Sequence, residues 1–223
     1  MLKIWLAIAL WVVSAAGAQA ATTWVEGKHY YRIEPARPID ITPGKVTVTE
    51  VFSYACPACN FFAPVADKLQ ASLPANARLD FVAASFRPDE DWPVFQRAYY
   101  TAQAMGIDKK THRAMFDAVW KTGALAIMDA SGRQVKRQMP TIEDAAAFYA
   151  RAANIKAETF LATAKSFGVD LKIRQAEELI RAWQIDGTPS IVVNGKYRLD
   201  VRSAGNNEAL IALVRWLVAR EHR

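Results

Sequence analysis

The chain has 223 residues, of which 52% are hydrophobic and 22% are charged, and its formal net charge is +6 at pH 7. This length suffices for one well-buried domain with an elaboration, or for two small lobes. The positive charge is modest and spread along the sequence, so it gives no support to a nucleic-acid-binding function.

Residues 1–20 form the first predicted segment. A charged start at Lys3, an apolar run from Ile4 to Val13 and small residues up to Ala20 are typical of a secretory signal peptide, which we expect to be cleaved after Ala20. An uncleaved membrane anchor is the alternative, but this apolar run is about half of the roughly 20 residues that a spanning helix needs. Because Lys3 is the only charged residue of the segment, the remaining chain carries +5 of the total +6.

A strand, a helix and a second strand are predicted next. Segment 45–53 alternates apolar and hydroxyl side chains, which predicts a strand with Glu50 on its apolar side. Apolar residues then recur at helical spacing, and Leu73-Pro74 is expected to end that helix. A second strand is expected over 79–86, and this order of elements predicts a crossover unit with parallel pairing.

Residues 88–168 change to a succession of helical patterns, which predicts an all-helical insertion. The basic residues Arg133, Lys136 and Arg137 lie in one of its connections and are expected to form a solvated loop. The chain is expected to return through a helix over 171–183. The predicted helices within the insertion cover 94–105, 112–120, 142–153 and 157–167.

The last part of the chain is predicted to form a hairpin and a helix. Asn194-Gly195 lies between two extended runs, and both residues suit a type I′ turn because this turn needs positive φ at its two central positions. Segment 208–219 carries one apolar stripe at helical spacing, which we interpret as a face packed in the core.

The run Cys56-Pro57-Ala58-Cys59 holds the only two cysteines of the chain and stands where the predicted strand passes into the predicted helix. Two thiols at this spacing can close a disulfide, and the partial positive charge of a helix N-terminus favours a thiolate. Cys56 is the outer residue and is expected to be the nucleophile. The motif therefore predicts a redox centre.

Two other uses of a cysteine pair are possible. In an exported chain the pair is expected to be oxidised, and a structural disulfide is one alternative, although so short a loop removes little chain entropy. A zinc site would need two more ligands, and His29, His112 and His222 are scattered along the sequence. Each histidine is therefore expected to be a surface or core residue, and no metal site is predicted.

Several segments in this order resemble the thioredoxin superfamily, and specifically the DsbA family of exported thiol–disulfide oxidoreductases. They are the strand leading into Cys-Pro-x-Cys, the helical insertion and Gly187-Thr188-Pro189 before a hairpin, together with residues 26–30, 104–107 and 193–197. The resemblance implies an α/β thioredoxin fold with an inserted all-helical domain. Residues 21–87 and 169–223 would form the thioredoxin-like domain, and residues 88–168 the insertion.

The resemblance also implies roles for single residues. A cis peptide bond is expected before Pro189, beside the active-site disulfide, with Thr188 offering main-chain groups to an extended substrate. Pro64 is expected to bend the active-site helix without ending it.

Glu50 stands where DsbA-like proteins place an acidic residue, and a buried carboxylate there could relay a proton for Cys59. The best-known relatives support this acid with a second acid and a lysine, at positions that hold Ala63 and Phe81 in this chain. The charge network is therefore reduced, and Glu50 is expected to be either a proton relay or a plain buried or ion-paired carboxylate.

The expected function is donation of the Cys56–Cys59 disulfide to reduced, unfolded secreted proteins through a mixed disulfide at Cys56, with no cofactor beyond that disulfide. The expected location is the periplasm, and nothing in the sequence requires more than a monomer. The resemblance implies that a quinone-linked inner-membrane partner of the DsbB type reoxidises the protein. Strongly oxidising relatives often carry a histidine where Ala58 stands, so a less extreme oxidant is expected. The alternatives are a disulfide isomerase or reductase, and a non-turnover peptide-binding or metal-delivery factor on the same fold.

Overall fold

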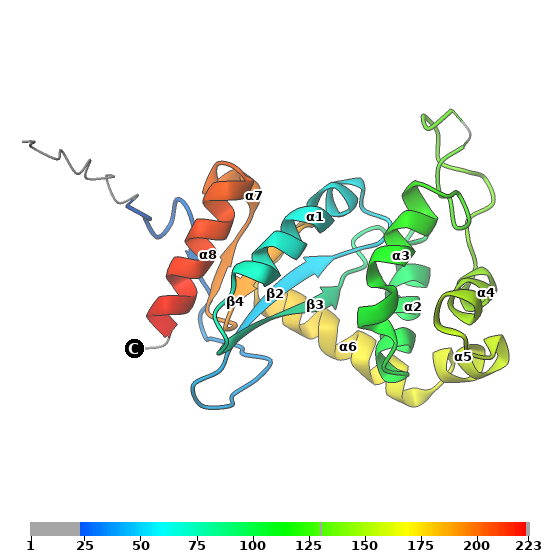
Figure 1. Cartoon of the computed structure of the whole chain (residues 1–223), viewed down its shortest axis with the longest axis horizontal. Coiled ribbons are helices and arrows are strands. Elements are labelled where there is room, and N and C mark those ends of the chain that lie inside the picture. The colour runs from blue at the N-terminus through cyan, green and yellow to red at the C-terminus, as the bar shows by residue number, and fades with distance from the viewer. Residues whose placement is uncertain (1–22, 130, 222–223) are drawn as a thin grey trace, which may run out of the picture.

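The computed structural model describes residues 23–129 and 131–221, so the predicted signal peptide, 1–20, lies outside the described residues. Figure 1 shows a sheet layered with helices, next to a lobe built from helices alone. No helix within the described residues is both long and apolar enough to cross a membrane.

A five-stranded mixed sheet forms the centre of the molecule, with the strand order β1-β5-β4-β2-β3. Strands β2 and β3 pair in parallel, as the crossover prediction requires, and the other neighbouring strands pair antiparallel. The second strand of the crossover begins and ends earlier than the predicted 79–86, because it pairs residue by residue with β2 and stops where β2 stops. The strands are β1 (Tyr31–Arg32), β2 (Val46–Phe52), β3 (Ala77–Ala83), β4 (Ser190–Val193) and β5 (Tyr197–Leu199).

Helices cover both faces of the sheet. Helices α1 (Pro57–Ser72) and α8 (Asn207–Glu221) pack against one face, and α6 (Phe167–Ala182) packs against the other. Strand β2 is consequently buried on both sides, including the hydroxyl side, where Thr47 and Thr49 are 3% and 2% exposed. Pro64 lies inside α1, and the helix continues beyond it to Ser72, as predicted.

The helical lobe is built mainly from four helices between β3 and α6, which Figure 1 shows beside one end of the sheet. One prediction in this region is wrong: the helix expected over 157–167 ends at Ala164, and a new helix begins at Phe167. The Ser166 side chain accepts a hydrogen bond from the Val169 N–H, which caps the start of α6 and separates the two helices. The four helices are α2 (Trp92–Ala104), α3 (Asp108–Trp120), α4 (Ile142–Ala153) and α5 (Ala157–Ala164).

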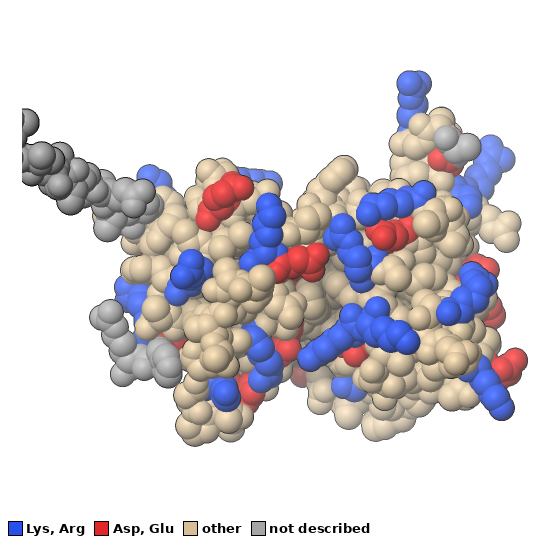
Figure 2. Space-filling view, viewed as in Figure 1, with Lys and Arg blue, Asp and Glu red and all other residues tan. Residues whose placement is uncertain are grey.

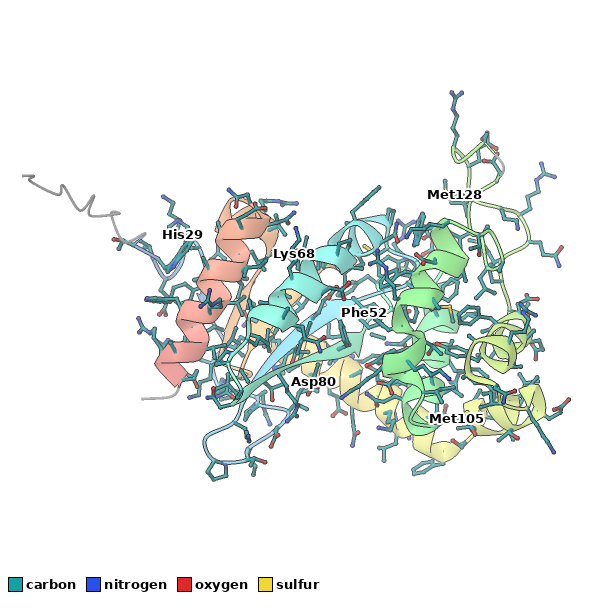
Figure 3. The ribbon with its side chains drawn as sticks, in the orientation of Figure 1. His29, Phe52, Lys68, Asp80, Met105 and Met128 are labelled. Carbon is teal, nitrogen blue, oxygen red and sulfur yellow. The ribbon has the colours of Figure 1, made fainter. Side chains whose placement is uncertain are left out.

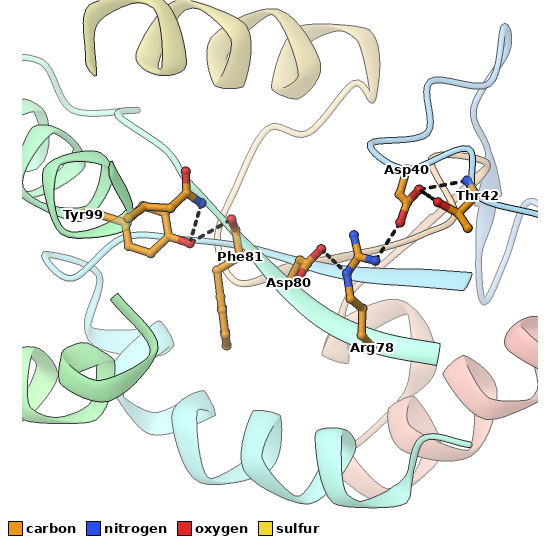
Figure 4. Close-up of polar contacts among 7 residues, drawn as sticks. Asp40, Thr42, Arg78, Asp80, Phe81 and Tyr99 are labelled. Atoms are coloured by element: carbon orange, nitrogen blue, oxygen red, sulfur yellow. Dashed lines mark hydrogen bonds and ion pairs between the residues drawn. The ribbon is translucent and has the colours of Figure 1, made fainter. Parts of the chain in front are cut away.

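Polar side chains lie along β3, one of the two edge strands of the described sheet, as Figure 4 shows. Arg78 donates to Asp80 at 2.8 Å and to Asp40 at 2.6 Å. Farther along the strand, the Tyr99 hydroxyl of α2 donates to the Phe81 carbonyl oxygen at 3.1 Å. Because an edge strand leaves main-chain groups unpaired, the Tyr99 contact satisfies one of them and ties the helical lobe to the sheet.

The predicted hairpin joins β4 to β5, and Asn194 and Gly195 both have positive φ, at 53° and 62°. A side chain at Gly195 would collide with the main chain of Arg37, whose carbonyl oxygen also accepts a hydrogen bond from Trp183 Nε1 at 2.9 Å. Glycine is therefore required at this position both for its conformation and for the close approach of a second segment. The short helix α7 (Val201–Ala204) follows β5.

Acidic and basic side chains are interspersed on the face seen in Figure 2, over both the sheet and the helical lobe. This distribution agrees with the diffuse charge of the sequence.

Candidate active site

Cys56 lies at the junction of the sheet and α1, where it is the N-cap residue of the helix. Its backbone is extended, with φ −86° and ψ 116°, and Pro57 begins the helix at a position where the missing N–H is not needed. The Cys59 N–H donates to Cys56 Sγ at 3.4 Å, so the sulfur takes the place of a capping oxygen. Both cysteines are free thiols in this structure.

The two thiols have opposite acidities. Hydrogen bonding from Cys59 and neighbouring groups outweighs burial and lowers the pKa of Cys56 from the ordinary 9 to about 6. Burial raises the pKa of Cys59 well above its ordinary value, and the neighbouring Cys56 adds to this shift. Cys56 is 5% exposed and Cys59 is fully buried. At neutral pH, Cys56 is thus the thiolate and Cys59 the protonated thiol.

The loop before β4 brings Thr188 and Pro189 next to the cysteines, although Thr188 is 132 residues from Cys56 in the sequence. The Thr188–Pro189 peptide bond is cis, as expected. Cys56 Sγ lies 3.5 Å from the Thr188 carbonyl oxygen. The residues that the sequence singled out on either side of the helical insertion therefore meet at one point.

A cavity of about 710 Å³ extends from this point, between the start of α1 and the segment around α7. Its edge carries Phe61, which is 77% exposed despite being aromatic. A groove beside the cysteines is expected from the sequence, but its lining residues could not be predicted, because its walls come from three segments, 58–62, 186–190 and 200–207, that meet only in the fold. The lining residues are Ala58, Phe61, Phe62, Asp186, Gly187, Thr188, Pro189, Ser190, Asp200, Val201, Arg202, Gly205 and Asn207.

Glu50 lies in the middle of β2, between Phe81 of β3 and Ile191 of β4, and is 2% exposed. Burial raises its pKa to about 8, and negative charge at Cys56 and Asp67 adds to the shift. No basic group of the described residues contributes, so the structure favours a buried, protonated carboxyl over the ion-paired alternative.

Comparisons with known proteins agree with this geometry. The family model described as "DSBA-like thioredoxin domain" matches residues 47–210, which is more than half of the chain. The thiol:disulfide interchange protein DsbA of Pseudomonas aeruginosa is 32% identical over 205 residues, covering 92% of this chain and 89% of that protein. The chain belongs to the DsbA family. Another DsbA, from Dickeya dadantii, is 33% identical over 202 residues and covers 89% of this chain and 86% of its own length.

The structural comparison leads to the same family. The crystal structure of Pseudomonas aeruginosa DsbA superposes with a TM-score of 0.74 at 32% identity, covering 89% of this chain and 94% of that one. The α/β thioredoxin fold expected from the sequence is therefore confirmed. As a member of the DsbA family, the chain is a thiol–disulfide oxidoreductase whose redox group is a pair of its own cysteines.

Three residues near this DsbA-type cysteine pair were not recognised as site residues in the sequence: Tyr54, His112 and Trp120. His112 was expected to be a surface or core residue. It is partly buried in an aromatic cluster and contacts Tyr54, which lies two residues before Cys56 in the chain. The spacing of His112 and Phe116 on one side of α3 was the available signal. His29 lies at the N-terminal segment, where its Nδ1 accepts from the Val25 N–H, and His222 lies outside the described residues.

Proposed function

We propose that this protein is a periplasmic disulfide oxidase that transfers the Cys56–Cys59 disulfide to reduced, unfolded secreted polypeptides. The observation that carries the proposal is the opposite acidity of the two thiols at the start of α1. A thiolate that is stable near neutral pH leaves a mixed disulfide readily and stabilises the reduced enzyme, which makes the disulfide form an oxidant.

The reaction begins when a substrate thiolate attacks Cys56 Sγ of the oxidised enzyme. A substrate–Cys56 disulfide forms, the Cys56–Cys59 bond breaks, and Cys59 leaves as a thiolate. A second substrate thiolate then attacks the substrate sulfur, and Cys56 leaves as a thiolate. The substrate has lost two electrons and gained a disulfide, and the enzyme has gained two electrons as a dithiol.

Cys59 needs a proton when it leaves, because its pKa is raised well above the ordinary value. Glu50 holds a proton at neutral pH, and its charge is one of the influences on the pKa of Cys59. Glu50 is accordingly the proposed proton relay, acting without the second acid and the lysine that relatives have at the positions of Ala63 and Phe81.

The cis-proline loop and the adjacent cavity are the proposed substrate site. Thr188 would pair through its main chain with an extended peptide, as an added strand pairs with a sheet edge. Pro57 and Ala58 lie exposed between the two cysteines and would face the same peptide. The apolar surface of Phe61 would pack against side chains of the substrate or of the reoxidising partner.

The remaining parts of the proposal concern the whole chain. Residues 1–20 would direct export and be removed after Ala20, residues 21–87 and 169–223 would form the thioredoxin-like domain, and residues 88–168 would form the inserted domain. The protein would act as a monomer, and a DsbB-type, quinone-linked oxidase of the inner membrane would restore the Cys56–Cys59 disulfide.

The test measures the oxidation of a reduced model protein. Isomerisation of a disulfide-scrambled protein and reduction of insulin are measured in parallel. We expect fast oxidation of the reduced protein by the wild type and none by Cys56→Ser or Cys59→Ser. With the scrambled protein, the Cys56 thiolate of Cys59→Ser should attack a substrate disulfide and accumulate as the mixed disulfide, because no second cysteine displaces it. Acid trapping of thiols in cells should show the wild type mainly oxidised. A mainly reduced resting state would favour the isomerase or reductase, and activity that survives Cys56→Ser would point to a role without cysteine turnover.

A further inference from the structure

The turn that presents Cys56 is centred on Tyr54. The Cys56 N–H donates to the Ser53 carbonyl oxygen at 3.1 Å, and the Ala55 N–H donates to Ser53 Oγ at 3.1 Å. Residues 53–56 thus form a compact turn between β2 and α1, with Tyr54 as its second residue. Any rotation of Tyr54 would move the Cys56 main chain and, with it, the sulfur.

Helix α3 of the helical lobe holds Tyr54 at two atoms. The Tyr54 hydroxyl lies 2.8 Å from His112 Nδ1, and Trp120 Nε1 donates to the Tyr54 carbonyl oxygen at 2.8 Å. His112 and Trp120 are about two helical turns apart on α3, so they lie on the same side of the helix. One helix therefore fixes both the side chain and the main chain of the turn residue.

Aromatic packing keeps the His112 ring in place. Its centroid lies 4.3 Å from that of Phe81 and 4.9 Å from that of Phe52. Figure 3 shows Phe52 between the sheet and α3, which is where these rings meet. Burial, with a smaller contribution from Arg113, lowers the pKa of His112 to about 4, so a neutral imidazole shares one hydrogen bond with the Tyr54 hydroxyl at physiological pH.

We propose that His112 and Trp120 are positioning residues that act on Cys56 through Tyr54. The Cys59 N–H donates to Cys56 Sγ at 3.4 Å, and because a hydrogen bond weakens steeply as it lengthens or bends, a displacement of the turn that carries Cys56 would weaken this thiolate-stabilising contact. The helical lobe would thereby set the stability of the thiolate. The inference rests on the proposed role of Cys56 as nucleophile.

The experiment compares His112→Phe and Trp120→Phe, each of which keeps a ring and removes one hydrogen bond to Tyr54. In each variant we expect the acid dissociation constant of Cys56, followed by thiolate absorbance, to fall at least threefold. The equilibrium with glutathione should shift at least threefold toward the oxidised enzyme. His112→Asn keeps an acceptor near the position of Nδ1 and should restore most of both values.

Two further variants separate positioning from a general loss of packing. Tyr54→Phe removes only the hydroxyl and should match His112→Phe, and the double variant should be no worse than either single one. Tyr99→Phe removes a hydroxyl hydrogen-bonded to Phe81 in the same aromatic cluster and should leave Cys56 unchanged.

Unfolding of every variant is measured in parallel. Unchanged acidity of Cys56 in His112→Phe and Trp120→Phe, or an equal shift in Tyr99→Phe, would overturn the inference. Neither result affects the proposed function, which fails only if the wild type does not oxidise substrate thiols through Cys56.

Discussion

Ala58 is the residue between the cysteines through which the strength of the oxidant can be changed. It is exposed in the first turn of α1, and its own N–H already helps to lower the pKa of Cys56. In Ala58→His, a charge-assisted contact of about 1.5–3 kcal/mol to the thiolate should raise the reduction potential by tens of millivolts, since 30 mV corresponds to about 1.4 kcal/mol. The glutathione equilibrium measures this shift.

A neutral control isolates the effect of charge at this position. Ala58→Gln adds a donor without a positive charge and should move the potential less than Ala58→His. A wild-type potential equal to or above that of Ala58→His would contradict the prediction that this protein is the milder oxidant.

Glu50 should make the folded protein less stable as pH rises. Its pKa is 4.5 ordinarily and about 8 in the fold, so between these values the folded state binds more protons than the unfolded state. The free energy of unfolding then falls with increasing pH across this window, by at most about 1.4 kcal/mol per pH unit. Glu50→Gln does not titrate and should gain stability relative to the wild type from pH 4.5 to 8.

Urea unfolding of the two oxidised proteins over a series of pH values checks this, because the disulfide form removes the titration of Cys56. Burial is the main cause of the shift and is present in both redox forms. Parallel stability profiles of wild type and Glu50→Gln from pH 4.5 to 8 would show that Glu50 titrates normally in the fold.

Among single residues, the sequence predicted those whose role depends on their place within one strand or helix. Cys56 follows a strand and begins a helix, and Glu50 shares the apolar side of that strand, so both could be placed from periodicity. The contact of Tyr54 with His112 joins residues 58 positions apart, and it depends on where α3 packs. Periodicity gives the buried side of a helix but not the segment that this side meets.

Among the elements, the β4–β5 hairpin depends most on a single residue. In Gly195→Ala, a left-handed backbone should cost about 1–2 kcal/mol, and the collision of the added methyl group with Arg37 should cost more. Gly44→Ala is the matched control, because Gly44 also has positive φ but has open space around it. Thermal or urea unfolding should show a clearly larger loss for Gly195→Ala, and equal losses would mean that the Arg37 segment moves aside.

Helix boundaries show what periodicity can and cannot predict. The predicted end at Leu73-Pro74 was confirmed. Leu73 has the extended backbone, with φ −72° and ψ 144°, that a following proline favours, and this pair of residues is visible in the sequence. The break at residues 165–166 was missed, since apolar residues continue on both sides of it and the deciding feature is one side-chain hydrogen bond from Val169 to Ser166. A serine side chain can cap a helix or face solvent, and only the course of the chain decides.

For the whole molecule, the sequence predicted a thioredoxin-like domain and a helical insertion, and the structure shows how closely the helical lobe is joined to the sheet. Helix α6 begins next to the helical lobe and packs its later turns under the sheet, so the boundary expected at residue 168 falls in its first turn. Arg97 of α2 reinforces this junction through the Ala164 carbonyl oxygen at 2.7 Å and Asp170 at 2.8 Å. These contacts tie the helical lobe to the helix that packs against the sheet.

The redox state should change the stability of the whole fold in a pH-dependent way. Because the pKa of Cys56 falls from 9 to about 6 on folding, the unfolded reduced chain binds more protons than the folded one between these values. The free energy of unfolding of the reduced form should therefore rise with pH from about 6 to 9, by at most about 1.4 kcal/mol per unit. Cys59 contributes little until the pH approaches its ordinary pKa of 9, where the unfolded thiol begins to ionise while the folded one stays protonated, which opposes the rise.

Urea unfolding of the reduced and oxidised forms at pH 5, 7 and 9 measures the difference between them, from which the titration of Glu50 largely cancels. Cys56→Ser has no thiolate at this position, and its stability should not show the rise. The reduction potential and the unfolding free energies of the two redox forms belong to one thermodynamic cycle. A reduced form that unfolds more easily than the oxidised form at pH 7 would therefore mean that folding favours the disulfide over the dithiol. The protein would then be a poor oxidant.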